Sequence, residues 1–273
     1  MGTKSFLSQS YTAADKMITL TSDFGLVDPY TSEMKGVILT INPNAAIIDI
    51  THSVEKFNIR MGAFMLASAV PYFPKGTVHL AVVDPGVGTE RHAILIQTKQ
   101  GFFVGPDNGV LMLAAQNEGI EHVYELANPK FMLSKVSGTF HGRDIFAPAA
   151  AYLDKGVKPS EFGAEVTDVV TPEYANVKRK NGSLIGEVLH IDGFGNIITN
   201  ITQVDLPQTK TVKVKLQNHT MQLAFTKTYA QAKPKEAVAL VGSHGFLEIA
   251  LNQGSAAEKF GVKVGDEVEV ASA

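Results

Sequence analysis

A short loop brings a carboxylate and a guanidinium together behind an apolar, strand-like run. That run covers residues 78–83 and ends at Asp84, and Arg91 follows seven residues later. The proline and glycines between them favour a turn rather than a continued strand. The pair can be a structural salt bridge, which is the slightly favoured interpretation for two such residues alone. The loop can also cradle a phosphate, but it matches neither common phosphate-binding glycine motif.

Two further side chains have chemistry that suits a site at the end of a strand. Asp23 directly follows the first apolar run, and ligands of open α/β sheets bind at the carboxyl ends of strands. Its carboxylate can accept both hydroxyls of a ribose, or it can equally cap the next helix. His141 lies between Gly138 and Gly142, just before a helix. Such a histidine can move a proton near neutral pH, although a single histidine is more commonly an exposed loop residue.

The second half of the chain carries its polar candidates in turns. Asp192 and Asn196 stand in the segment IDGFGN, which is typical of a hairpin turn. The same segment can recognise a polar ligand, with Phe194 as a stacking face. Ser243, in GSHG, is either a turn residue or a hydroxyl donor.

A metal-dependent hydrolase is the alternative that these residues leave open. Its ligands would be His141, Asp84, Asp23 and Asp107. The chain has neither H-E-x-x-H nor EF-hand spacing, and the aspartates belong to separate turn motifs. Asp107 and Asn108, in GPDNG, are interpreted as a structural turn. We therefore expect no metal.

The order of apolar segments indicates how these residues are positioned. Strand and helix patterns alternate in the first half, which predicts an α/β domain with a largely parallel sheet over residues 17–170. Expected strands cover residues 17–21, 46–50, 77–83, 93–98, 102–104 and 122–125, and expected helices cover 30–41, 59–72, 110–117 and 143–155.

The second half changes character after a polar segment at residues 166–182, which we interpret as a linker. Short strands separated by turns predict a small β-barrel or sandwich domain over residues 183–273. These strands are expected at residues 184–191, 197–199, 211–216, 220–225, 237–241, 246–251 and 267–270.

Composition excludes several classes of protein. The chain has 273 residues, of which 45% are hydrophobic and 19% charged, with a net charge of −3. Because it carries no block of Lys and Arg, we expect no nucleic-acid partner. It has no cysteine, so disulfides and thiolate chemistry are impossible. No apolar run has the length of a membrane span, and the polar residues 1–16 form an expected tail without a signal-peptide core. A cytoplasmic location is the default expectation.

Taken together, several segments resemble the S-adenosyl-L-methionine hydroxide adenosyltransferases, which are related to the fluorinating and chlorinating enzymes that use the same substrate. The resemblance runs from about Met17 to the C-terminus. It rests on the order of the blocks TLTSDFGLVDPY, IIDITHSV, VHLAVVDPGVGTERH, FVGPDNGVL, GTFHGRDIFAPAAA, IDGFGNIITNI and GSHGFLEIALNQGSAA.

This resemblance implies an N-terminal α/β domain, a C-terminal β-barrel, and a homotrimer with each site between two subunits. It implies that water or hydroxide attacks the ribose 5′ carbon of S-adenosyl-L-methionine, giving adenosine and L-methionine. No cofactor is expected, because the substrate's sulfonium is already a good leaving group.

The hydrolase branch of the family has Asp, Arg and His around the water, and Asp84, Arg91 and His141 occupy those places. Asp84 and His141 would orient the water and help to take its proton, while Arg91 would hold the carboxylate. Which of Asp84 and His141 is the base stays open. The halogenating branch has an aromatic residue in place of Asp84 and a Ser in place of Gly142.

The resemblance also implies which residues bind the substrate. Asp23 would bridge the ribose hydroxyls, and Asn196 would address the adenine edge. The methionine end would be held by three polar side chains, Asp28, Asp192 and Ser243. The apolar walls of the pocket would be formed by Phe57, Phe194 and Tyr229. The halogenating relatives have Arg where this chain has His244. Two other functions remain as alternatives, a halogenase and a non-catalytic module that senses S-adenosylmethionine or adenosine.

Overall fold

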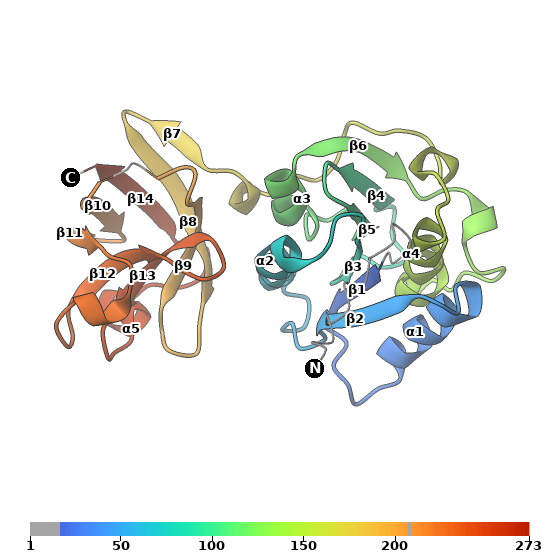
Figure 1. The fold of residues 1–273 in the computed structure, drawn as a ribbon, viewed down its shortest axis with the longest axis horizontal. Helices are drawn as coiled ribbons and strands as arrows, with labels where there is room; N and C mark the ends of the chain where they lie inside the picture. Colours follow the sequence, from blue (N-terminus) through green and yellow to red (C-terminus); the bar gives the residue numbers. More distant parts are fainter. Residues whose placement is uncertain (1–16, 207–208, 273) are drawn as a thin grey trace, which may run out of the picture.

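A computed structural model describes residues 17–206 and 209–272, so the expected tail at residues 1–16 lies outside it. The N-terminal part is built on one six-stranded sheet (Figure 1). In sheet order its strands are β2 (Ala46–Thr51), β1 (Met17–Ser22), β3 (Val78–Val82), β5 (Phe102–Pro106), β4 (Ala93–Thr98) and β6 (Ile120–Glu125). Strand β4 is antiparallel to both its neighbours, whereas β2, β1, β3 and β5 pair in parallel.

Helices cover both faces of this sheet, because the strands are apolar on both sides. Leu80 of β3 packs in the core cluster of α1 (Tyr30–Ile41) and α4 (Ala147–Asp154). Ala81, the next residue, packs in the opposite cluster with α2 (Ile59–Ala69) and α3 (Met112–Glu118). The sheet is therefore the middle layer of three, as the alternating pattern predicts.

The C-terminal part is a closed barrel of seven strands. In order they are β14 (Glu267–Ser272), β10 (Thr211–Leu216), β11 (His219–Phe225), β12 (Ala237–Val241), β13 (Phe246–Leu251), β9 (Ile197–Thr202) and β8 (Ser183–Ile191), and the pairing of β14 with β8 closes the ring. A short strand, β7 (Lys178–Lys180), extends β8 from within the segment expected to be a linker. The predicted fold class, α/β followed by a small β-barrel, is confirmed.

The two parts lie side by side, with α2 of the first facing β8 of the second (Figure 1). Phe64 of α2 stacks on His190 of β8, with ring centroids 4.8 Å apart. Arg60 pairs with Glu187 at 2.8 Å across the same contact. These contacts join the two parts of the chain, and none of them involves a residue that lines the cavities described below.

Two helices differ from the sequence prediction. The helix expected over residues 59–72 ends at Ala69, and a 3₁₀ turn follows over Val70–Tyr72. The helix expected over residues 143–155 begins with a π-helical turn, Gly142–Phe146. Pro148 has no amide hydrogen to donate to the Asp144 carbonyl, and the Leu133 N–H donates to it instead, at 2.9 Å. Shorter 3₁₀ turns cover Pro129–Phe131, Pro159–Glu161, Glu173–Ala175 and Tyr229–Gln231.

Candidate active site

A cavity of about 660 Å³ opens at the carboxyl ends of β1 and β3. Four residues predicted from the sequence line it: Asp23, Phe57, Asp84 and His141. We call this the N-terminal cavity. The parallel sheet explains its position, since strand ends that point the same way bring their following loops together.

Arg91 stands behind the cavity wall and joins two of these residues. Its Nε donates to both carboxylate oxygens of Asp84, at 3.0 and 3.1 Å, and its Nη2 also donates to that carboxylate. The same Nη2 donates to His141 Nδ1 at 2.9 Å. The Asp84 side chain is 4% exposed and that of Arg91 10%, so the charges are neutralised within the protein. The predicted salt bridge and the predicted triad are thus one arrangement.

The contact with Arg91 determines how His141 carries its proton. Because Nδ1 accepts from the guanidinium, the ring hydrogen of the neutral form is on Nε2. Burial and the positive charge of Arg91 lower the pKa of His141 below its usual value, against the opposing effects of Asp84 and Asp144. His141 is therefore a neutral hydrogen-bond donor at Nε2 near pH 7.

A close backbone approach brings the loops of Asp84 and His141 together. Gly88 has φ of 77°, and a Cβ there would lie 2.2 Å from the Gly138 carbonyl oxygen. Only glycine fits this position, since any side chain would push the loop of Asp84 away from that of His141. The π-helical turn then begins directly after His141.

Asp23 is held at the cavity by the segment that follows β2. The Phe57 N–H donates to Asp23 Oδ2 at 2.9 Å, and the Lys56 ammonium donates to the Asp23 carbonyl at 2.5 Å. Helix α1 has Pro29 at its N-cap and no side-chain cap. The helix-cap alternative for Asp23 is therefore wrong.

The structure adds cavity residues that sequence reasoning did not single out. Three are aromatic rings that contact one another edge to face, with centroids 5.2 to 5.8 Å apart: Phe24, Tyr30 and Phe140. Three more carry charge: Glu33, Lys56 and Arg143. Arg143 pairs with buried Asp144 at 2.7 Å and with Glu33 at 2.8 Å. Phe24 and Phe140 directly neighbour Asp23 and His141, which was the available signal.

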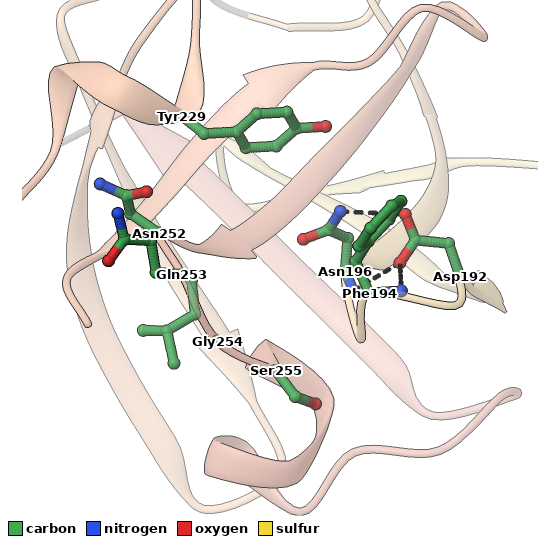
Figure 2. Close-up of a pocket in the computed structure, with 9 residues that line it drawn as sticks. Asp192, Phe194, Asn196, Tyr229, Asn252, Gln253, Gly254 and Ser255 are labelled. Carbon is green, nitrogen blue, oxygen red and sulfur yellow. Dashed lines mark hydrogen bonds between the residues drawn. The ribbon is translucent and has the colours of Figure 1, made fainter. Parts of the chain in front are cut away.

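A second cavity, of about 620 Å³, lies in the barrel and shares no lining residue with the first. Four predicted binding residues line it: Asp192, Phe194, Asn196 and Tyr229. The turn after β13, residues 251–255, forms the rest of its wall, with Tyr229 on one side and Phe194 across from it (Figure 2). We call this the C-terminal cavity.

The Asp192 carboxylate shapes the loop that carries Phe194 and Asn196. Its Oδ1 accepts from the backbone N–H of Phe194 and of Asn196, both at 2.9 Å, and its Oδ2 accepts from Asn196 Nδ2 at 2.9 Å (Figure 2). The hairpin-turn interpretation of this segment is therefore correct. The turn also fixes the Asn196 amide, whose oxygen points away from Asp192.

Besides Arg91, two predicted residues line neither cavity. Asp28 is exposed on the loop before α1. Ser243 is also exposed, and its backbone carbonyl accepts a 2.8 Å hydrogen bond from the Tyr72 hydroxyl. His244 lies 3.2 Å from the buried Glu248 carboxylate, which also accepts from the Tyr229 hydroxyl at 2.7 Å. In this chain His244 thus contacts Glu248, a buried residue of barrel strand β13.

The described residues include no group of three or more His, Asp or Glu side chains placed to hold a metal ion. In residues 17–206 and 209–272, no helix has the length and apolar character needed to cross a membrane.

Comparison with known proteins adds to this geometry. Residues 18–163 match the SAM hydroxide adenosyltransferase N-terminal domain, and residues 186–269 match the C-terminal domain. The chain is 38% identical to an (R)-S-adenosyl-L-methionine hydrolase of Methanocaldococcus jannaschii over 93% of this chain and 95% of the relative. A fluorinase of Actinoplanes sp. is 28% identical over 94% of this chain and 98% of its own length.

A solved structure of an uncharacterized conserved protein from Thermotoga maritima superposes with a TM-score of 0.81, at 40% identity, over 93% of this chain and all of the other. Both family domains are therefore present in the expected order. The chain belongs to the SAM hydroxide adenosyltransferase family.

Proposed function

We propose that this protein hydrolyses S-adenosyl-L-methionine to adenosine and L-methionine. The observation that carries the proposal is the bridge that Arg91 makes between Asp84 and His141 at a cavity that Asp23 also lines. The family's hydrolase relatives at 38 to 39% identity support the same reaction. No added cofactor is needed in this proposal, because the sulfonium already leaves as a neutral thioether.

The geometry also favours a division of roles between the two candidate bases. His141 offers an N–H at Nε2, so it holds the water oxygen as a donor. The Asp84 carboxylate accepts a proton of the same water. The water oxygen then forms a bond to the ribose 5′ carbon as the carbon–sulfur bond breaks, and the electron pair of that bond stays on sulfur. The proton leaves through Asp84 to solvent, so charge and atoms balance.

Gly142 distinguishes this reaction from halide transfer. A Cβ at Gly142 would lie 3.2 Å from a ring carbon of Phe140 and 3.3 Å from the Met34 sulfur. The serine of the halogenating branch would therefore need its neighbours to shift. Asp84, where that branch has an aromatic residue, further favours water as the nucleophile.

We further propose that a complete site forms between copies of the chain. The residues expected to bind ribose and water line one cavity, and those expected to bind adenine line another with no residue in common. Large apolar side chains near both cavities are exposed: Val27 is 99% exposed, Phe57 67% and Phe194 82%. A homotrimer that sets one chain's N-terminal cavity against a neighbour's C-terminal cavity would cover them.

The hydrolysis is tested by chromatography after incubation with S-adenosylmethionine, without halide and with a chelator present. Equal amounts of adenosine and methionine are expected, with ¹⁸O from labelled water in the adenosine 5′ hydroxyl. Bound but unchanged substrate would instead support the sensing module, and a halide requirement would support a halogenase.

The shared site is tested by mixing Asp84→Ala, which lacks the proton acceptor, with Asn196→Asp, whose second carboxylate beside Asp192 weakens nucleoside binding, at a substrate concentration too low for either variant alone to turn over. Mixed assemblies contain some sites with both cavities intact, so activity should return after subunit exchange. Light scattering should give three times the chain mass. A monomer with full activity would contradict this arrangement.

A further inference from the structure

A Ser, His and Asp arrangement lies beside the N-terminal cavity, with its serine and histidine buried and its aspartate at the surface. Ser22, the last residue of β1, has its Oγ 2.7 Å from His52 Nδ1. His52 Nε2 lies 3.1 Å from Asp49 Oδ1, and the other oxygen of Asp49 accepts from Lys35 of α1 at 2.6 Å. Ser22 is 1% exposed and His52 5%. None of the four lines the cavity.

The direction of the Ser22–His52 hydrogen bond follows from the charge of Asp49. Burial opposes ionisation, but the hydrogen bond from the Lys35 ammonium and the nearby His52 ring outweigh it and lower the pKa of Asp49. An ionised carboxylate facing Nε2 favours the ring hydrogen there, so Nδ1 accepts from the Ser22 hydroxyl. The Ser22 oxygen in turn accepts the Phe24 N–H at 3.3 Å. The hydroxyl therefore both donates and accepts a hydrogen bond and is shielded from solvent, unlike the exposed nucleophile of a serine hydrolase.

This chain of contacts ends at the two residues that flank Asp23. Ser22 precedes it, and Phe24 follows it. His52 also accepts the Gly25 N–H at its carbonyl, at 2.7 Å. The backbone on both sides of Asp23 is thus fixed to His52, while Phe57 holds one carboxylate oxygen.

We propose that Ser22, His52 and Asp49 form a positioning network that aims the Asp23 carboxylate at the two ribose hydroxyls. This inference rests on the proposed function, in which Asp23 binds the ribose. A carboxylate binds two adjacent hydroxyls well only if both oxygens are held at hydrogen-bond distance, and held polar groups reject ligands that lack a partner. The network therefore sets the preference for ribose over deoxyribose.

The chain offers a matched control in its other buried histidine and hydroxyl pair. His79 of β3 has its Nδ1 2.8 Å from Thr19 Oγ1 of β1, and it is 2% exposed. The pair lies near the start of both strands, whereas the cavity lies at their ends. A substitution at His79 thus disturbs the same sheet without touching the loop of Asp23.

The experiment is calorimetric titration of adenosine and of 2′-deoxyadenosine into the full-length protein and its variants. The unaltered protein should bind adenosine at least about tenfold more tightly, the size of one well-placed hydrogen bond to a charged group. That ratio should fall to about twofold in Ser22→Ala and His52→Leu, as in Asp23→Ala. It should persist in His79→Leu and in His52→Asn, whose amide oxygen replaces Nδ1 as an acceptor.

The ratio separates positioning from general stability, since a partly unfolded variant loses affinity for both nucleosides equally. An unchanged ratio in folded Ser22→Ala and His52→Leu, with loss in Asp23→Ala, would overturn the network and leave the ribose role of Asp23 intact. Equal affinity for both nucleosides in the unaltered protein would overturn that role itself, and the network with it.

Discussion

The two cavities of this chain are formed by different kinds of side chain. The N-terminal cavity has ionised groups that are buried and paired, with Arg91 joining Asp84 to His141. The C-terminal cavity has an amide fixed by a turn and the largely exposed ring of Phe194. Buried paired charges suit the stabilisation of a reacting group, because their field is strong and already oriented. Amides and aromatic faces suit recognition of a flat, neutral base. The contrast predicts that substitutions in the first cavity reduce kcat and those in the second raise KM.

The largest effect is expected for Asp84→Asn. This change keeps the size of the side chain but removes the proton acceptor, so kcat should fall about 10³-fold, within the range of general-base catalysis. Adenosine affinity should change by less than about threefold, a fraction of one hydrogen bond. Single-turnover hydrolysis and calorimetry measure the two quantities. Undiminished turnover would remove Asp84 from the mechanism.

The second-largest expected difference between the cavities is in the pH dependence of kcat. Since the pKa of His141 is lowered, the ring is neutral at pH 7. Protonation of Nδ1 at lower pH removes the acceptor for Arg91 and breaks the bridge to Asp84, so activity is lost as the pH falls through that lowered value. The acid limb should therefore lie below pH 6.5, the usual histidine value, with about a tenfold loss per pH unit beneath it. His141→Gln, which retains a donor, should lose the limb. Adenosine binding should not follow this profile, and a limb that remains in His141→Gln would assign it to another group.

These expectations indicate which parts of the site were accessible from sequence. Asp23, Asp84 and His141 each follow a strand or precede a helix, and parallel strands place such positions at one edge. That Arg91 contacts both Asp84 and His141 was not accessible, because it depends on how closely Gly88 approaches Gly138. The proximity of loops distant in sequence is a property of packing.

Two helical segments were not predicted from the sequence, and only one of them had a readable signal. Helix α5 (Ala256–Phe260) was missed among the strands, although Ser255 caps it by accepting the Glu258 N–H at 3.1 Å, and Gly261 ends it in the left-handed conformation. Those signals were readable. The π-helical turn after His141 was not readable, because a proline removes a backbone donor in many helices that contain no π-helical turn.

A moderate effect is expected for Asn196→Ala in the C-terminal cavity. It removes an amide whose Nδ2 is bound to Asp192, leaving the oxygen for the adenine edge. KM should rise about tenfold with kcat nearly constant, because one hydrogen bond is lost in both ground and transition states. Gln253→Ala, on the opposite wall, is the matched control and should change KM by less than about twofold. A fall in kcat alone would contradict the division between the cavities.

The smallest effect is expected for Phe194→Ser, and it sharpens the comparison through assembly. The ring is 82% exposed in the single chain, so its removal should leave the thermal unfolding of a monomer unchanged. In a trimer that stacks it on adenine beside a neighbour's N-terminal cavity, the same change should weaken adenosine binding about threefold to tenfold, the range of one lost stacking contact. Differential scanning fluorimetry with and without adenosine measures both effects at once.

A lower melting temperature without ligand would place the ring in a subunit contact rather than against the base. An unchanged adenosine shift would remove Phe194 from the site, and the C-terminal cavity would then recognise the nucleoside through Asn196 and Tyr229.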